Sequence, residues 1–523
     1  MDNTAASSRN IEPVDQPTTY REVETKFRVD DKFAMPDLSL TGGRAVAQPV
    51  VNLVATYFDT DDLRLARSGV TLRRRTGGGD EGWHLKLPAG TTDARDEVRL
   101  PLSASRANKV PPPLEQLVVG LTRAMPLVVR GKQRTQRTPY LVSDRDGLLC
   151  LEVVDDKVAI TAGPLAGFKY REVEVEVLEE SDLQPLVVEM LRDAGAHPSE
   201  SKSKGVRTVA GDEALQPIVP APERARPKDA AGLAVTGHIR THVSALLAQD
   251  VRVRQGLPDS VHQFRVAARR LRSGLQAFGP LLDEEWARHA RGELGWIAGV
   301  LSAARDREVL EVRLFAAIRA LPGDLDRAAA FVAVQDHLEA ELVVANDQIA
   351  ATLQSDRYLT LLDSLVAAAS SPPLTDLARE PARRVLPPLV NKRWKKLARE
   401  ASRLHDELQG HDDHWHETRK TAKKARYSVE ACIPVFGSPA KKLAKQLEVV
   451  TELLGEHQDC AVAADTIAAL VTKETGPRAA FALGALYASQ RRRIVETRHQ
   501  FVEAWPHISH TEWRKWLKGS NAQ

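Results

Sequence analysis

Charged and apolar residues alternate with a period of two in the first part of the chain. Short runs show this alternation, and Gly, Pro and Asp residues separate them: YREVETKFRV, NLVATYFDT, VTLRRRT, WHLKLP, DEVRLPL, LCLEVV and YREVEVEVL. Such runs are typical of strands with one polar and one apolar face. The pattern predicts an antiparallel β domain over residues 20–210, behind a polar, unstructured segment 1–19.

The period becomes helical after Ala230. A Pro-rich stretch precedes the change and predicts a linker over residues 211–228. Ala, Leu and Arg dominate from there on, and the segment SSPPLTDLAREPARRVLPP divides the region near residues 370–388. We therefore expect an all-α domain of two parts over residues 229–515, followed by a tail at 516–523.

The two helical parts carry the same basic pattern. His262, Arg265, Arg269, Arg270 and Arg272 are matched, at the same spacing, by His416, Arg419, Lys423, Lys424 and Arg426. Asp306 and Asp459 lie in matching contexts farther along each copy, where we expect them to orient basic side chains through ion pairs. Such repetition indicates two copies of one structural unit.

Each copy predicts a helix with one basic face. At 100° per residue, His262, Arg265, Arg269 and Arg272 lie on the side opposite Phe264. A single basic face is usually only solvated, but repetition at matched offsets favours an anion site. Asp259 and Asp413 each precede a His by three residues, as helix N-caps would, which places the His in a first turn that favours anions. A metal at HDDHWH is the weaker alternative, because the other copy lacks the extra histidines.

Charged rows also follow the strands of the β domain. Residues two apart share a face, so the rows comprise Glu22, Glu24 and Lys26; Glu172, Glu174 and Glu176; Arg73 and Arg75; His84 and Lys86; and Arg95, Glu97 and Arg99. Arg134, Arg137 and Lys204 add further cations. One such face would normally be solvated, but so many rows suit a closed barrel that holds a polyanion with hard cations. Gly77, Gly78, Gly79 and Gly82 match a dinucleotide fingerprint formally, but they form a hairpin loop with no helix after it.

Composition narrows the class of protein. The chain has 523 residues, 5% aromatic residues and a net charge of +3, so bulk charge argues against nucleic-acid binding. Three cysteines without zinc spacing favour a reducing compartment. The polar start MDNTAASSRN is unlike a secretory signal, and no apolar run approaches the roughly 18 residues of a membrane span. We expect a cytoplasmic protein.

In their order, the ExExK, LRRR, WHLKLP, DEVR, EVEVE and SK segments resemble the CYTH domain of the triphosphate tunnel metalloenzymes. The resemblance implies an eight-stranded antiparallel tunnel that binds a linear triphosphate with Mg²⁺ or Mn²⁺. It also implies metal ligands at Glu22, Glu24, Glu172, Glu174 and Glu176, and phosphate contacts from Lys26, Arg73, Arg75, Lys86, Arg134 and Lys204. Glu22, Glu24 and Lys26 form the implied catalytic set. The pattern leaves the register of Arg137, Glu152 and Asp156 open.

The helical region resembles a CHAD domain through the signature HxxRxxxRRxR at His262 to Arg272 and its second copy. The resemblance implies two four-helix bundles around a basic cleft that binds inorganic polyphosphate. The two basic stripes would line that cleft, and Arg393, Lys395 and Lys396 would add to it.

The sequence therefore suggests an α+β multidomain protein with a metal-dependent inorganic triphosphatase tunnel and a polyphosphate-binding helical domain. Association with polyphosphate granules would follow from such binding. Two alternatives stay open: a binding protein without turnover, and a tunnel enzyme acting on an organic triphosphate, such as an adenylate cyclase or a thiamine triphosphatase.

Overall fold

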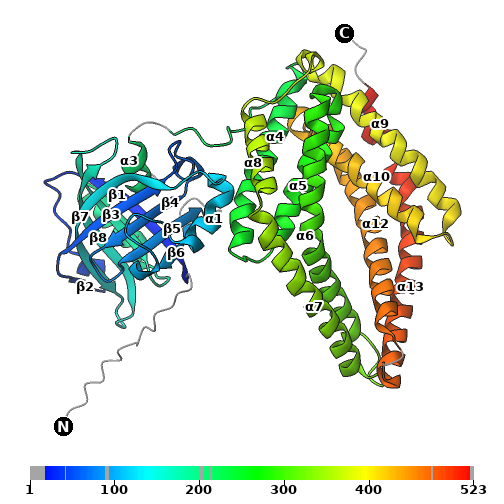
Figure 1. The fold of residues 1–523 in the computed structure, drawn as a ribbon, viewed down its shortest axis with the longest axis horizontal. Helices are drawn as coiled ribbons and strands as arrows, with labels where there is room; N and C mark the ends of the chain where they lie inside the picture. The colour runs from blue at the N-terminus through cyan, green and yellow to red at the C-terminus, as the bar shows by residue number, and fades with distance from the viewer. Residues whose placement is uncertain are drawn as a thin grey trace. The chain divides into compact units, whose positions relative to one another are not determined.

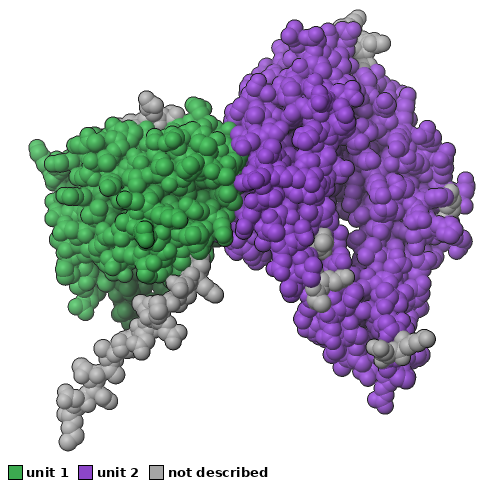
Figure 2. All heavy atoms as spheres, in the orientation of Figure 1, with its two compact units in different colours: residues 1–218 green, residues 219–523 purple. Residues whose placement is uncertain are grey.

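The computed structural model describes residues 18–41, 43–88, 94–199, 204–211, 215–472 and 475–518. The chain divides into two compact units, residues 1–218 and 219–523 (Figure 2). The division falls within the stretch for which the sequence predicts a linker. Residues 1–17 of the predicted unstructured segment and 519–523 of the predicted tail lie outside the described residues, and the first strand already begins at Thr18.

Eight antiparallel strands close the first unit into a barrel (Figure 1). Their order around the barrel is β1 (Thr18–Val29), β6 (Ala94–Leu100), β5 (Gly82–Pro88), β4 (Thr71–Thr76), β3 (Val51–Asp59), β7 (Val128–Ser143), β8 (Leu149–Ala162) and β9 (Lys169–Val177). The long strand β1 closes the ring, because its first half pairs with β6 and its second half with β9. Two short strands add to this sheet: β2 (Arg44–Ala47) pairs with β7, and β10 (His197–Pro198) pairs with β1. The predicted antiparallel tunnel is confirmed.

The barrel is polar inside and apolar outside. Val173 and Val175 of β9 belong to a buried cluster with Val187 of helix α2 (Leu183–Asp193) and Leu38 of η1 (Leu38–Thr41). Because successive side chains of a strand point to opposite faces, the glutamates between these valines point into the barrel. The chain thus keeps an apolar core on the outer face of the sheet, and the charged side chains of these strands point to the interior. The unit also contains the helical segments η2 (Ala66–Ser68), η3 (Leu102–Ala104) and α1 (Pro112–Thr122).

Helix α3 (Lys204–Ala210) lies against the inner face of the barrel at one end. A Cβ atom at Gly205 would lie 2.7 Å from the Tyr57 ring and 2.9 Å from Thr71 Cγ2, so only glycine fits there. Thr208 Oγ1 donates to Gln133 Oε1 at 2.8 Å. This close fit fixes Lys204, the first residue of α3, beside the strands that carry the acidic rows.

The second unit is all-helical and consists of two halves (Figure 1). The first half contains α4 (Ala231–Arg254), α5 (Ser260–Ala277), η4 (Gly279–Leu281), α6 (Glu284–Arg319), α7 (Arg327–Leu353), α8 (Asp356–Ser370) and η5 (Asp376–Arg379). The second contains α9 (Ala382–Arg403), η6 (Leu404–Glu407), α10 (Asp412–Glu430), α11 (Ile433–Phe436), α12 (Ser438–Leu470), α13 (Pro477–Ile508) and η7 (Thr511–Lys518). The predicted all-α fold is confirmed.

Each half is a helix bundle, and the two halves differ in which helices occupy the place of the fourth helix. In the second half the single helix α13 packs on α12 and returns to α9, where Trp505 stacks on Trp394. In the first half α7 and α8 share this position, and Tyr358 of α8 donates to Asp250 of α4 at 2.8 Å. Within the described residues, we find no helix that combines the length and apolar character of a membrane span.

Candidate functional site

A cavity of about 390 Å³ inside the barrel is lined by charged side chains of both signs. The basic ones are Lys26, Arg73, Arg75, Lys86, Arg95, Arg99, Arg137 and Lys204. The acidic ones are Glu22, Glu24, Asp80, Glu97, Glu152, Glu174 and Glu176. Buried charges are costly unless each has an opposite charge or a bound ion beside it. The interior is therefore suited to a ligand that is itself charged.

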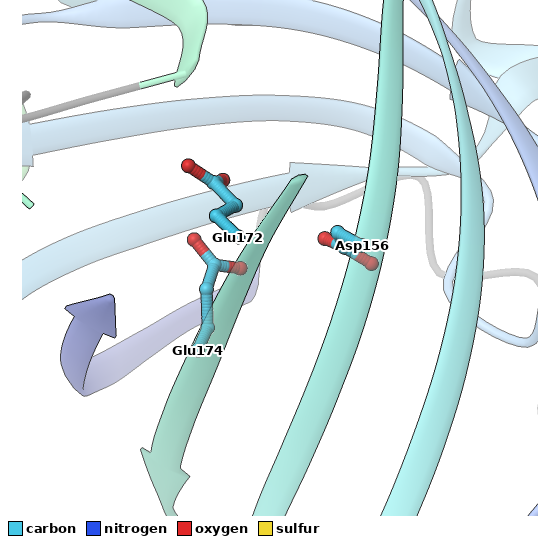
Figure 3. Close-up of side chains that lie close together, drawn as sticks. All are labelled: Asp156, Glu172 and Glu174. Atoms are coloured by element: carbon cyan, nitrogen blue, oxygen red, sulfur yellow. The ribbon is translucent and has the colours of Figure 1, made fainter. Parts of the chain in front are cut away.

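Three carboxylates gather on β8 and β9 (Figure 3). Asp156 lies opposite Glu172 in the strand pairing, and Glu174 follows on the same face of β9. One oxygen from each lies within 4.8 Å of the others, and no other such group of acidic, His or Cys side chains occurs in the described part of the chain. Lys204 Nζ lies 2.8 Å from Glu172 Oε1 and 3.1 Å from Glu174 Oε2.

This cluster fits a hard divalent cation. Mg²⁺ and Mn²⁺ prefer carboxylate oxygens, and three of them converge here. Arg137 donates to both Asp156 oxygens, at 2.9 and 2.7 Å. Burial would raise the pKa of Asp156, but Lys204 and Arg137 lower it, so this ligand is ionised. Burial lowers the pKa of Lys204 to about 7 despite Asp156.

The ExExK residues lie on the inner face of β1, next to this cluster. Lys26 Nζ is 2.9 Å from Glu24 Oε1 and 2.7 Å from Glu174 Oε1. Lys86 donates to Glu22 at 2.6 Å. Burial would raise the pKa of Glu24, but Lys26 and Lys86 lower it to about 2. Lys26 therefore connects the carboxylates of β1 with those of β9.

Two tunnel carboxylates of β9 have a raised pKa: burial raises the pKa of Glu174, and the same cause acts on Glu176. In the strand pairing, Glu176 lies opposite Glu24 of β1 on one side and opposite Glu152 of β8 on the other. Burial, and then the charge of Glu22, raises the pKa of Glu176 to about 7. A carboxyl group of this kind takes up or releases a proton near neutral pH.

A buried carboxylate holds the basic side of the tunnel in place. Glu97 is 1% exposed and lies 3.0 Å from His84 Nδ1, 3.8 Å from Arg73 and 3.9 Å from Lys86. Arg99 also donates to Glu97 at 2.6 Å. The cations on β4, β5 and β6 therefore point into one space, where they can contact successive phosphate groups.

A second cleft, of about 630 Å³, lies within the helical unit. Among the described residues, every charged side chain that lines this cleft is basic. These side chains are Arg265, Arg269 and Arg272 of α5, Arg288 and Arg291 of α6, and Lys420, Lys423 and Lys424 of α10. Burial, and then Arg419 and Arg269, lower the pKa of Lys423 to about 7. Cations crowded to this extent favour an anion between them.

Ion pairs hold one arginine of α5 and one of α10, and the α5 arginine, Arg265, lines the cleft. Arg265 lies 3.1 Å from Asp306, and Arg419 lies 3.8 Å from Asp459. The orienting role that the sequence predicts for the two aspartates is confirmed by these contacts.

Comparison with known proteins identifies the family. The CYTH domain model matches residues 20–209, and the CHAD domain model matches residues 237–468. The uncharacterised protein MT2285 of Mycobacterium tuberculosis (strain CDC 1551 / Oshkosh) is 33% identical over 518 residues, which cover 94% of this chain and 96% of that protein. The chain belongs to the CYTH–CHAD proteins.

Solved structures resemble each domain separately. PptA from Streptomyces chartreusis is 25% identical, covering 53% of this chain and all of that one at a TM-score of 0.47. The CHAD domain of Ricinus communis is 24% identical, covering 54% of this chain and 96% of that one at a TM-score of 0.44. HpAC1 from Hippeastrum, assigned as an adenylyl cyclase and described with a dominant triphosphatase activity, is 19% identical, covering 37% of this chain and 98% of that one at a TM-score of 0.24.

In the CYTH domain, the structure corrects one expected phosphate contact. Arg134 is exposed on the outer face of β7, opposite the exposed Val54 of β3. Arg137 lies three residues farther along the same strand. Because side chains alternate between the two faces, it points inward and lines the cavity. The other expected phosphate contacts, Lys26, Arg73, Arg75, Lys86 and Lys204, all line the cavity.

In the CHAD domain, the structure does not bring Arg270 and Arg426 into the basic cleft. Both line a separate cavity on the other side of α5 and α10. Arg426 donates to Glu430 at 2.6 Å and to Glu448 at 2.5 Å, and Arg270 lies 3.6 Å from Glu430. Arg270 follows Arg269 by one residue, a rotation of about 100°, so the two side chains leave the helix on different sides.

Helix α9 brings Arg393 and Lys396 close to the cleft. Arg393 donates to the carbonyl oxygen of Gln276 at 2.9 Å, and burial and then Arg291 lower its pKa. Burial, and then Lys396 and Arg393, lower the pKa of Lys424. The cations of α9 thus add to the field at the α10 side of the cleft.

The expected helix caps are only partly present. Asp259 precedes α5, but its side chain makes no cap hydrogen bond. Helix α10 begins at Asp412 with His411 at the N-cap, so the expectation for Asp413 is wrong. His262 therefore lies in a first turn, whereas His416 lies in a second turn and pairs with Gln458.

Sequence reasoning left the register of Asp156 open and missed Arg288 and Arg291. Asp156 continues the face of Glu152 in the run LEVVDD, which was the available signal. Arg288 and Arg291 are three residues apart on α6, outside the repeated signature, so only their helical spacing pointed to a shared face.

Proposed function

We propose that the CYTH domain hydrolyses inorganic triphosphate with a divalent metal ion, and that the CHAD domain binds inorganic polyphosphate. The observation that carries the first part is the cavity wall, where cations for phosphate lie beside Glu174, the member of the three-carboxylate cluster that lines the cavity. Asp156 and Glu172 complete the cluster next to it. At ~30 Å³ per water molecule, the cavity holds roughly a dozen waters, which is about the bulk of a linear triphosphate.

Each group in the tunnel has a distinct task in this proposal. Asp156, Glu172 and Glu174 would hold Mg²⁺ or Mn²⁺, which when bound neutralises phosphate charge and makes water a better nucleophile. Arg73, Arg75, Lys86, Arg137 and Lys204 bind phosphate oxygens and stabilise the charge that shifts to the leaving group.

The residues of β1 and Glu176 complete the catalytic set. Lys26 binds a phosphate oxygen. Glu24 keeps Lys26 in position, Glu22 keeps Lys86 of β5 in position, and both glutamates supply further oxygen ligands. Glu176 is our candidate for accepting the proton of the attacking water, because its carboxyl group titrates near neutral pH.

The deciding experiment is a substrate comparison on the full chain. Purified protein with Mg²⁺ or Mn²⁺ is offered tripolyphosphate, ATP, thiamine triphosphate or long polyphosphate, and released phosphate and cyclic AMP are measured. We expect tripolyphosphate to give the highest kcat/KM. Cyclic AMP as the main product, or no turnover of any substrate, would contradict the proposal.

An organic triphosphate is the second candidate, and one observation favours it. One side of the tunnel wall is apolar, because Val51, Leu53, Pro139, Val154 and Leu178 line the cavity on the neighbouring strands β3, β7 and β8 and just beyond β9. An apolar surface of this kind would suit the organic group of a nucleotide or thiamine triphosphate.

Polyphosphate binding in the CHAD domain rests on the cleft whose charged lining residues, within the described part of the chain, are all basic. A flexible chain of phosphates can follow such a cleft, and it would bring substrate close to the enzyme. Affinity is expected to fall as salt rises, because the bound chain releases counterions.

This binding is expected to weaken as pH rises through neutrality. Lys423 carries its charge below about pH 7 and loses it above, so affinity for long polyphosphate falls roughly threefold to tenfold between about pH 6 and about pH 8.5. The measurement is a polyphosphate titration across this range. Lys423→Arg is the matched control: it stays charged and should flatten the profile, and an unchanged slope in this variant would contradict the assignment.

A further inference from the structure

The loop between β4 and β5 forms part of the tunnel wall. Gly78, Gly79 and Asp80 line the cavity, and Gly77 and Gly78 have positive φ angles of 85° and 83°, which favour glycine. Strand β4 runs from Thr71, which contacts Gly205 of α3, to Thr76. The loop therefore lies at the end of β4 that is farther from α3.

Asp80 attaches this loop to the phosphate-binding side of the tunnel. Its carboxylate pairs with the guanidinium of Arg75, whose side chain is only 5% exposed. Its carbonyl oxygen lies 2.9 Å from His84 Nε2, and His84 Nδ1 lies 3.0 Å from Glu97. The loop thus ends on the same buried network that holds Arg73 and Lys86.

The loop also rests on the apolar side of the wall. A Cβ atom at Gly78 would lie 3.0 Å from Leu53 Cδ2 and 3.3 Å from Val51 Cγ1. The backbone of Gly78 therefore lies against Val51 and Leu53, which belong to the apolar surface that would suit an organic group.

From these contacts we infer that Asp80 selects the substrate of the tunnel. Its carboxylate occupies the Arg75 guanidinium, which a phosphate group of the substrate needs. A phosphate carries more charge than a carboxylate and displaces it. An inorganic triphosphate has to displace only the carboxylate, whereas an organic triphosphate must also move the loop away from Val51 and Leu53. The inference rests on the proposed function, since it names what that site admits.

The test is Asp80→Asn in the full chain, which keeps the size of the side chain and removes its charge. We expect KM for tripolyphosphate to fall roughly threefold to tenfold, as for loss of one competing, partly exposed ion pair, while kcat stays unchanged. We expect KM for ATP to fall further, because the loop loses its ion pair to Arg75 and keeps only its contacts with His84, Val51 and Leu53, so the ratio of kcat/KM for tripolyphosphate to that for ATP falls. Glu81→Gln is the matched control: Glu81 accepts from Gly77 N at 3.3 Å within the same loop and does not line the cavity.

Arg75→Ala separates competition from a change in the fold of the loop. In this background Asp80→Asn should leave KM for tripolyphosphate unchanged, because the contested cation is gone. An unchanged KM for Asp80→Asn in the natural background, or an equal effect in both backgrounds, would overturn the inference.

Hydrogen exchange provides a readout that does not depend on turnover. Adding tripolyphosphate should speed exchange of the amides of residues 77–81 in the natural chain and slow it in β1 and β9. Protection of the strands without release of the loop would overturn the role of Asp80 and leave the proposed function intact. No protection of the strands and no turnover would instead refute the proposed function.

Discussion

Replacement of Glu174 by glutamine is expected to lower kcat for tripolyphosphate by about a hundredfold or more. The neutral amide is a poor ligand for a hard dication, and loss of a supporting residue around a metal site alone costs ~10–100-fold. The change also removes the charge that Lys26 and Lys204 face, at 2.7 and 3.1 Å. Because Gln and Glu have the same shape, the barrel should stay folded.

Two measurements make this prediction specific. Calorimetry should show weaker Mn²⁺ binding in Glu174→Gln, independently of activity. Glu179→Gln, an exposed substitution just beyond the same strand, should change neither metal binding nor turnover. Rates like those of the natural chain in Glu174→Gln would refute the assignment of the metal to Asp156, Glu172 and Glu174.

The variant Glu24→Gln addresses the carboxylates that the sequence placed in the catalytic set. The carboxylate of Glu24 forms an ion pair with Lys26. Glu24 does not belong to the cluster of Asp156, Glu172 and Glu174. If it also ligates a metal, its loss should weaken Mn²⁺ binding as Glu174→Gln does. A raised KM with unchanged Mn²⁺ affinity would show instead that Glu24 acts only by positioning Lys26.

Period-two patterning predicted the antiparallel strands because the apolar face of each strand had to be buried, and the resemblance to a CYTH domain implied that they form a tunnel. The rule works for REVEVEV, where Val alternates with Glu, and it placed Glu172 and Glu174 inside correctly. It could not decide between neighbours of the same charge. Asp155 and Asp156 are adjacent and both buried, but Asp155 pairs with Arg171 on the outer face, whereas Asp156 pairs with Lys204 inside.

Register caused the error at Arg134. The run RTQRTPY has polar residues on both faces, so alternation of hydrophobicity gives no signal there. Only the pairing of Arg134 with Val54, an outward residue of β3, determines its face. A strand whose two faces are both polar has to be placed by its neighbours.

In the helical domain, the repeat predicted an anion site, and the resemblance to a CHAD domain implied the cleft, but neither gave its full membership. Repetition identified α5 and α10 as equivalent, and Arg265, Arg269 and Arg272 of one stripe line the cleft with Lys423 of the other, whereas His262, His416 and Arg419 are not among its lining residues. The signature, however, counts Arg270 and Arg426 with the stripe, whereas helical geometry turns them toward Glu430. Arg288 and Arg291 enter from α6, and only tertiary packing brings that helix to the cleft.

Reversal of charge in the cleft is expected to remove polyphosphate binding. Arg265→Glu/Arg269→Glu replaces two of the cations that line the cleft by anions that repel the polyphosphate chain, so affinity at low salt should fall by about a hundredfold or more. The slope of log affinity against log salt should become shallower as well, because fewer phosphates are neutralised. Both quantities come from titrations of the full chain with long polyphosphate at several salt concentrations.

Arg270→Glu is the sharpest control for this experiment. It makes the same change on the same helix, one residue from Arg269, but the side chain lines the opposite cavity beside Glu430. It should therefore lower polyphosphate affinity far less than Arg269→Glu, and thermal melting should show that both variants are folded. Duplex DNA is the control for the ligand, since a wide, rigid rod cannot enter a cleft of about 630 Å³ as a flexible phosphate chain can. Equal losses in Arg269→Glu and Arg270→Glu, or DNA binding as tight as that of polyphosphate, would mean that the affinity arises from the overall charge of the domain and not from the cleft.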